Sequence, residues 1–253
     1  MRCNNLLMLT SSVQHDLPLR RITLHCIERQ VSWDQSLQQL LFSPIEEQAQ
    51  LREASLFPPV TAPTPLPTAA GSKLELGSWP QTSAGNQSEV EATFMLPATS
   101  AKFGVVVMGG GNSSSSNMAA TSGGMLFYVD YLPPPGVDAR NGDGDDVYTV
   151  VVGTESLSGG SGIGGTTDLL RLHKNETSVT IRVFVDNTMA EGYWQRGRVA
   201  MSTLVTPTVQ SSMSAARISG GNVTLASAQG WTVGSIWVSA DDVLSSATAL
   251  KES

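Results

Sequence analysis

The chain has 253 residues, of which 40% are hydrophobic and only 15% are charged, and its formal net charge is −7. An acidic surface repels nucleic-acid phosphates and anionic lipid head groups, so we expect neither nucleic acid nor a membrane as a partner. No stretch reaches the roughly 20 apolar residues that a membrane-spanning helix requires. The low charge and the 24 glycines favour an all-β fold over a helical bundle.

The N-terminal part contains two short extended segments. Residues 22–27 and 37–42 are expected to be strands, with Trp33 and Asp34 in the turn between them. This stretch is too small to hold a hydrophobic core by itself.

A capping box predicts the one helix of the chain, over residues 43–54. Ser43 is suited to the N-cap, Pro44 to the first helical position, and Glu46 completes the box three residues after Ser43. Glu46 and Glu47 would also lie at the positive end of the helix dipole. The cap and the dipole explain this acidic pair without a catalytic role.

The Pro-rich residues 57–71 predict an extended spacer with few hydrogen bonds, and strand-like segments follow from residue 72 onward. About ten strands with no helical pattern between them predict an antiparallel, concanavalin-like β-sandwich. The Gly- and Ser-rich stretches 109–124 and 153–166 are expected to be surface insertions. The expected strands are 88–96, 103–108, 125–132, 146–152, 178–186, 189–194, 198–205, 222–228 and 231–239.

Two chemical motifs are present only in part, and we expect no cofactor. Gly160 to Gly165 match G-x-G-x-x-G, but a dinucleotide site needs a helix after this turn, and a strand-like segment follows it. The three histidines are scattered, so no Ser-His-Asp arrangement is evident. Neither they nor the two cysteines have the spacing of metal ligands. These residues are His15, His25, His173, Cys3 and Cys26.

Residues 138–146 are dense in Asp and Gly, as calcium loops are. Asp143, Asp145 and Asp146 are the candidate ligands. Because Arg140 takes a ligand position and no glutamate closes the loop, we interpret the segment as a solvated hairpin turn rather than a metal site.

Four Asn-x-Ser/Thr sequons begin at Asn86, Asn112, Asn175 and Asn222. Together they favour the secretory route and an extracellular or vacuolar location. The first residues lack a convincing signal peptide because their apolar run is short, which fits a chain whose true amino terminus is missing.

Four tryptophans are candidates for stacking on sugar rings, namely Trp79, Trp194, Trp231 and Trp237. Aromatic residues in sandwiches more often lie in the core, and we expect this of Trp237 in particular.

Two blocks of sequence resemble glycoside hydrolase family 32, the family of invertases and fructan hydrolases. Leu17-Pro18-Leu19-Arg20 and the later segment 40–47 resemble the end of the catalytic domain in that family. A downstream hairpin motif of the family is also present, with Thr188 in place of Ser and Arg196 in place of the first Gly. The residues at its other positions are Asp186, Glu191, Gly197 and Arg198.

The resemblance implies a five-bladed β-propeller that carries the catalytic carboxylates, followed by a β-sandwich. The family holds these carboxylates in Asn-Asp-Pro, Arg-Asp-Pro and Glu-Cys motifs, and none of the three occurs in this sequence. No catalytic residue is therefore transferred. We expect residues 1–42 to be the last propeller strands, 43–71 a linker, and 72–253 the sandwich module of a β-fructofuranosidase for sucrose or fructan.

This interpretation predicts an inactive chain whose partner is the missing propeller. Glu46, Glu47, Asp186, Glu191 and Arg198 are the candidates for structural or interdomain contacts. Asp186 and Glu191 are equally suited to local turn hydrogen bonds. Two other functions stay open, a free-standing carbohydrate-binding sandwich and an enzyme with a site of its own.

Overall fold

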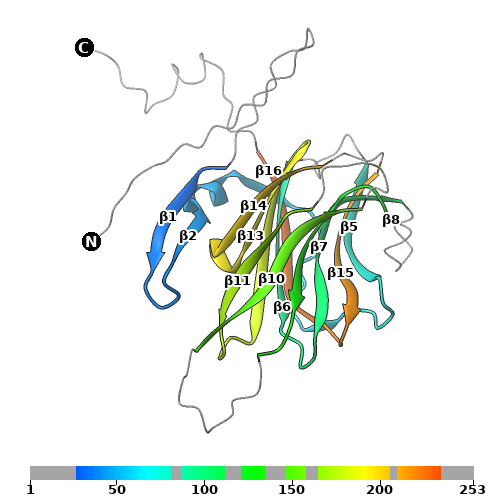
Figure 1. The fold of residues 1–253 in the computed structure, drawn as a ribbon. Helices are drawn as coiled ribbons and strands as arrows, with labels where there is room; N and C mark the ends of the chain where they lie inside the picture. Colours follow the sequence, from blue (N-terminus) through cyan, green and yellow to red (C-terminus); the bar gives the residue numbers. More distant parts are fainter. Residues whose placement is uncertain are drawn as a thin grey trace, which may run out of the picture.

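Two antiparallel β-sheets packed face to face make up most of the computed structural model (Figure 1). The structure describes residues 27–80, 87–111, 121–134, 146–157, 165–205 and 210–234. The predicted all-β class and the antiparallel sandwich are confirmed. Within these ranges no helix is long and apolar enough to cross a membrane.

The two sheets are called the β6 sheet and the β7 sheet, after an interior strand of each. The β6 sheet has the strand order β14-β13-β12-β6-β16-β3, and β4 also pairs with β16. Its strands are β14 (Val199–Leu204), β13 (Met189–Trp194), β12 (Ser178–Asp186), β6 (Gln87–Met95), β16 (Thr224–Val233), β3 (Arg52–Ser55) and β4 (Thr64–Pro65).

The β7 sheet has the strand order β11-β10-β9-β7-β15-β5, and β8 also pairs with β7. Its strands are β11 (Thr167–His173), β10 (Val147–Ser156), β9 (Met125–Tyr131), β7 (Ala101–Gly111), β15 (Gln210–Gly220), β5 (Ser72–Pro80) and β8 (Thr121–Ser122).

The core lies between the sheets, where strand alternation places the apolar side chains. Val90, Ala92 and Phe94 of β6 are all fully buried there. A Cβ at Gly192 would lie 2.3 Å from Cδ1 of Phe127, so the sheets approach too closely at this point for a larger residue. Removing this apolar surface from water is the main term that holds the two layers together.

An N-terminal hairpin precedes the sandwich, with β1 at Arg29–Asp34 and β2 at Gln39–Pro44. The predicted turn was placed wrongly, because Trp33 and Asp34 are the last residues of β1 and the chain reverses over 35–38. Asp34 fixes the turn there, since its Oδ1 accepts hydrogen bonds from the backbone N–H groups of Ser36 and Leu37, at 2.9 and 3.1 Å.

The predicted helix over 43–54 is wrong. Strand β2 runs to Pro44, a short 3₁₀ helix, η1, follows at Glu46–Leu51, and β3 begins immediately after it. Ser43 does not cap a helix, because its hydroxyl donates to the carbonyl of Arg196, at 2.5 Å. Glu46 and Glu47 are exposed in the first turn of η1 and make no cap.

The Pro-rich stretch 57–71 contains β4 and an isolated bridge at Val60, and, contrary to the prediction, it is not poor in hydrogen bonds. The N–H of Val60 donates to Ala228 and that of Leu66 donates to Val223, both at 2.9 Å. Phe57 and Leu66 are buried in the core. The stretch therefore lies along the edge of the β6 sheet, and β3 and β4 join this sheet although they precede the expected boundary at residue 72.

Several strand limits differ from the prediction. β16 is one continuous strand where two were expected, and β7 and β10 continue into the predicted insertions as far as Gly111 and Ser156. β5 and β15 were absent from the expected strands, because Gly and Ser interrupt the apolar alternation of β5 and Ser and Ala that of β15.

Candidate functional site

The N-terminal hairpin contacts the sandwich at three places, which together form the candidate interdomain contact of this chain. The contacting parts of the sandwich are β11, β13, β14 and the short 3₁₀ helix η4 at Gln195–Gly197. Figure 1 shows β1 and β2 on the side of the sandwich where β11, β13 and β14 lie.

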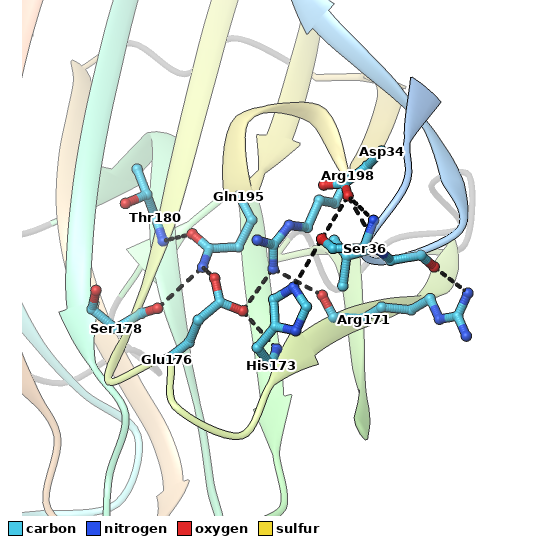
Figure 2. A network of polar contacts seen from close by, with 10 residues as sticks. Asp34, Ser36, Arg171, His173, Glu176, Ser178, Thr180, Gln195 and Arg198 are labelled. Carbon is cyan, nitrogen blue, oxygen red and sulfur yellow. Dashed lines mark hydrogen bonds and ion pairs between the residues drawn. The ribbon is translucent and has the colours of Figure 1, made fainter. Parts of the chain in front are cut away.

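The first place is the hairpin turn, which lies against β11. The hydroxyl of Ser36 donates to Oδ1 of Asp34 at 2.7 Å, so it accepts from Nε2 of His173 at 3.3 Å (Figure 2). Nη1 of Arg171 donates to the carbonyl of Leu37 at 2.6 Å. The hydrogen bond from Ser36, followed by weaker backbone bonds, lowers the pKa of Asp34.

This Asp-Ser-His chain is an anchor and not a catalytic triad. A triad places His between Ser and Asp, so that the imidazole can take the serine proton. Here the serine lies in the middle and already donates its proton to Asp34. The arrangement can hold a turn, but it does not activate a nucleophile.

A second set of bonds fixes η4 beside this turn (Figure 2). Nη1 of Arg198 donates to Oε2 of Glu176 at 2.7 Å and to the carbonyl of Arg171 at 3.0 Å. Gln195 donates to Oε1 of Glu176 at 3.0 Å and accepts from the N–H of Thr180, also at 3.0 Å. Arg198 thereby satisfies a carbonyl on edge strand β11, while Gln195 bonds to β12.

The second place is the direct backbone contact between β2 and η4. Gly197 has φ of +94°, and a Cβ there would lie 2.4 Å from the carbonyl oxygen of Phe42 and 2.7 Å from the nitrogen of Ser43. The glycine is therefore required both by its conformation and by the closeness of β2.

The third place is a buried carboxylate on the outer face of the β6 sheet. Glu191 is only 1% exposed. Its Oε2 accepts from the hydroxyl of Tyr193 at 2.7 Å and from Nη2 of Arg29 at 3.3 Å, and its Oε1 accepts from Ser202 at 3.1 Å and the N–H of Ile27 at 3.3 Å. Burial, and then the charge of Glu191, raise the pKa of Tyr193, so the phenol stays a donor.

A second buried carboxylate, that of Glu89, lies on the same outer face and is not among the site residues expected from the sequence. Glu89 accepts from Nε of Arg52 at 2.9 Å and from Nε of Arg182 at 2.6 Å, and the guanidinium of Arg52 lies 3.7 Å from the ring centre of Trp231. Val90, Ala92 and Phe94 face the core, so strand alternation puts Glu89 on the outer face, but its partner Arg52 is 37 residues away in the chain and no local pattern indicates the pair. Glu89 and Glu191 each receive an arginine from the segment that precedes residue 72.

Residues 149–232, which include most of β10 and β16 and all the strands between them in the chain, match the family model "Glycosyl hydrolases family 32 C terminal". The match confirms the resemblance to glycoside hydrolase family 32. Within the matched residues, Glu191 and Gly197 contact the N-terminal hairpin, and Arg198 holds η4 to β11 beside it.

Solved structures are similar to this chain in fold. Fructan 1-exohydrolase IIa from Cichorium intybus is 15% identical with a TM-score of 0.59, over 81% of this chain and 40% of that chain. Exo-inulinase from Aspergillus awamori is 14% identical with a TM-score of 0.59, over 88% of this chain and 38% of that chain. The present chain thus spans about two fifths of their length. No curated protein matches the sequence.

The other candidate residues do not join the contact with the N-terminal hairpin. Asp186 is exposed and accepts from the side-chain amides of Gln87 on the neighbouring strand β6, at 3.2 Å, and of Asn187, at 2.9 Å, so its bonds stay within the sandwich and do not reach the N-terminal hairpin. Asp146 is also exposed, and the described residues contain no group of three or more metal-ligating side chains. Asp143 and Asp145 lie outside the described residues.

The aromatic and sequon candidates differ in exposure. Trp194 is fully buried, and its ring centre lies 5.9 Å from that of Phe127. Trp79 and Trp231 are partly buried. Asn175 and Asn222 are exposed. Trp237, Asn86, Asn112, His15, His25, Cys3 and Cys26 lie outside the described residues.

Proposed function

We propose that this chain is the non-catalytic sandwich module of a β-fructofuranosidase-type glycoside hydrolase that acts on sucrose or fructan. The match of residues 149–232 to the family 32 C-terminal model carries this proposal. The charged groups of the candidate site support it, because Glu89, Glu191 and Glu176 are each paired with arginine and hold segments together. None of them is free to act as a general acid.

The partner that we propose is a propeller-type catalytic domain. In the described part of the chain, β1 and β2 pair only with each other, and a two-stranded sheet is marginally stable alone. Trp33 and Leu40 are directly opposite each other and are 57% and 48% exposed. An exposed apolar cross-strand pair on an incomplete sheet is suited to packing on further β-structure.

A secretory location, extracellular or vacuolar, and glycosylation are part of the same proposal. Their support is the presence of four sequons in an acidic, β-rich chain.

The experiment is to incubate the purified chain with sucrose and with inulin and to measure released fructose. We expect no release above the buffer blank. Mixing with the separately expressed catalytic domain of a family 32 fructan hydrolase should give a complex by size-exclusion chromatography, and Trp33→Ser should weaken it. Fructose release by the chain alone would contradict the proposal.

A free-standing carbohydrate-binding module is the second candidate, and the exposed ring of Trp33 is the observation that favours it. Retardation of the chain in an inulin affinity gel, lost in Trp33→Ala, would support this alternative. The absence of retardation together with complex formation would support the catalytic-domain partner.

A further inference from the structure

We propose that Asn175 is the preferred N-glycosylation site within the described part of the chain, and that Asn222 is disfavoured. This inference rests on the proposed secretory route. The two sequons differ little in sequence, Asn-Glu-Thr against Asn-Val-Thr, so the choice between them comes from the structure.

Asn175 lies at the tip of the turn that joins β11 to β12. Its side chain is exposed and makes no hydrogen bond within the described residues, and Thr177, the hydroxyl residue of the sequon, is exposed too. Glu176 lies between them in the chain, and its side chain faces the sandwich. Its two carboxylate oxygens accept hydrogen bonds from Gln195, Arg198 and the N–H of His173.

The turn is also held independently of the asparagine side chain. The N–H of Lys174 donates to the carbonyl of Asp146 at 2.8 Å, and the N–H of Glu176 donates to that of His173 at 3.0 Å. A glycan on Asn175 would therefore extend into solvent from a fixed tip and displace none of the bonds that fasten the N-terminal hairpin.

Asn222 is exposed, but the two residues after it belong to the sheet. Val223 is only 1% exposed, and its carbonyl accepts from the N–H of Leu66 at 2.9 Å. Thr224 begins β16, is partly buried, and pairs with both Met95 and Pro65. A transferase must reach the asparagine amide and the hydroxyl together. The carbonyl of Thr177 also accepts a backbone hydrogen bond, from Leu96, so the difference between the sequons is burial: Thr177 is exposed, whereas Thr224 is partly buried behind the buried Val223.

The modification joins Nδ2 of Asn175 to the anomeric carbon of an oligosaccharide carried on a lipid pyrophosphate. The C–N bond forms as the C–O bond to the phosphate breaks. The lipid pyrophosphate leaves with the bonding electron pair, and the amide loses one proton. No oxidant or reductant is required.

The test uses the full chain with a cleavable secretory signal appended, translated in the presence of microsomes, so that entry into the route is imposed. One variant keeps Asn175 as its only sequon (Asn86→Gln, Asn112→Gln and Asn222→Gln), and the matched variant keeps only Asn222. The readout is the mobility shift that peptide N-glycosidase removes, which requires neither activity nor export.

We expect a single-glycan shift in the Asn175-only variant, its loss on Thr177→Val and its retention on Thr177→Ser, with lower occupancy in the Asn222-only variant. No shift in the Asn175-only variant, or equal occupancy in the two variants, would overturn the inference. The chain without the appended signal tests the route separately, so failure of the route does not count against the site.

Discussion

Gly197 shows how a single residue can decide where a whole segment lies. Its positive φ and the closeness of Phe42 and Ser43 leave no room for a side chain. The sequence motif contained this glycine, but only the structure shows that the N-terminal hairpin is what passes over it.

Replacing Gly197 with Ala should lower the free energy of unfolding by about 2–3 kcal/mol, since a strained φ and a forced displacement of β2 add together. Urea unfolding measures this loss. Gly71→Ala is the control, because Gly71 also has positive φ but no atom lies within 4 Å of its Cβ position. Equal losses in the two variants would show that the approach of β2 is unimportant.

Glu89 is the buried charge whose removal should cost most. Glu89→Gln leaves Arg52 and Arg182 without their anion, and we expect a loss of about 3 kcal/mol in the free energy of unfolding. The control is Glu155→Gln in the exposed pair with Lys102, where about 0–1 kcal/mol is expected. A loss at Glu89 no larger than this control would argue against a structural ion pair.

Glu75 should behave in the opposite way. Burial raises its pKa above the ordinary value of 4.5, and its Oε2 is buried with no hydrogen-bond partner. The ionised form is therefore disfavoured in the folded state, and this cost is present above the folded pKa and absent below the unfolded one. Glu75→Gln should raise Tm at neutral pH, and the gain should fade as pH falls through the raised folded pKa of Glu75 and be absent below about 4. Glu47→Gln, at an exposed position, is the control, and it should leave Tm unchanged both at neutral pH and in the acid range.

At the scale of elements, the strands were predictable wherever apolar residues alternate without interruption. β12 and β13 have the expected limits, because every second side chain of β12 faces the core. The capping box at Ser43 failed because a tertiary hydrogen bond to Arg196 uses the hydroxyl that a helix cap needs. The short strands β3 and β4 could not be predicted, since their pairing with β16 is made across more than 150 residues.

The attachment of the hairpin to β11 can be tested by hydrogen exchange. Arg171→Met removes the donor to the carbonyl of Leu37, so the amides of β1 and β2 should exchange faster while those of β12 keep their rates. Lys174→Met, on the exposed turn, is the matched control. Unchanged exchange in β1 and β2 would mean that the Arg171 bond does not hold the hairpin.

At the scale of the whole molecule, the sandwich is not independent of the residues before 72. Phe57 and Leu66 lie in the core, and Arg52 pairs with Glu89. A sandwich trimmed to the expected boundary would lose these groups and leave the edge of β16 unpaired.

A chain that begins at residue 72 should therefore unfold at lower temperature and less cooperatively than one that begins at Ile27. Circular dichroism melting compares the two, and both contain every strand from β5 to β16. Equal melting curves would place the start of the folding unit at residue 72 after all.

The sequence by itself determined the class of fold and the family resemblance, because alternation, turn residues and local motifs are properties of neighbouring residues. The tertiary structure alone decided the pairing of Glu89 with Arg52, of Glu191 with Arg29, and the conformation of residues 43–54. Each of these depends on groups that are distant in the chain and meet only when the sheets form, and local propensity contains no information about such meetings.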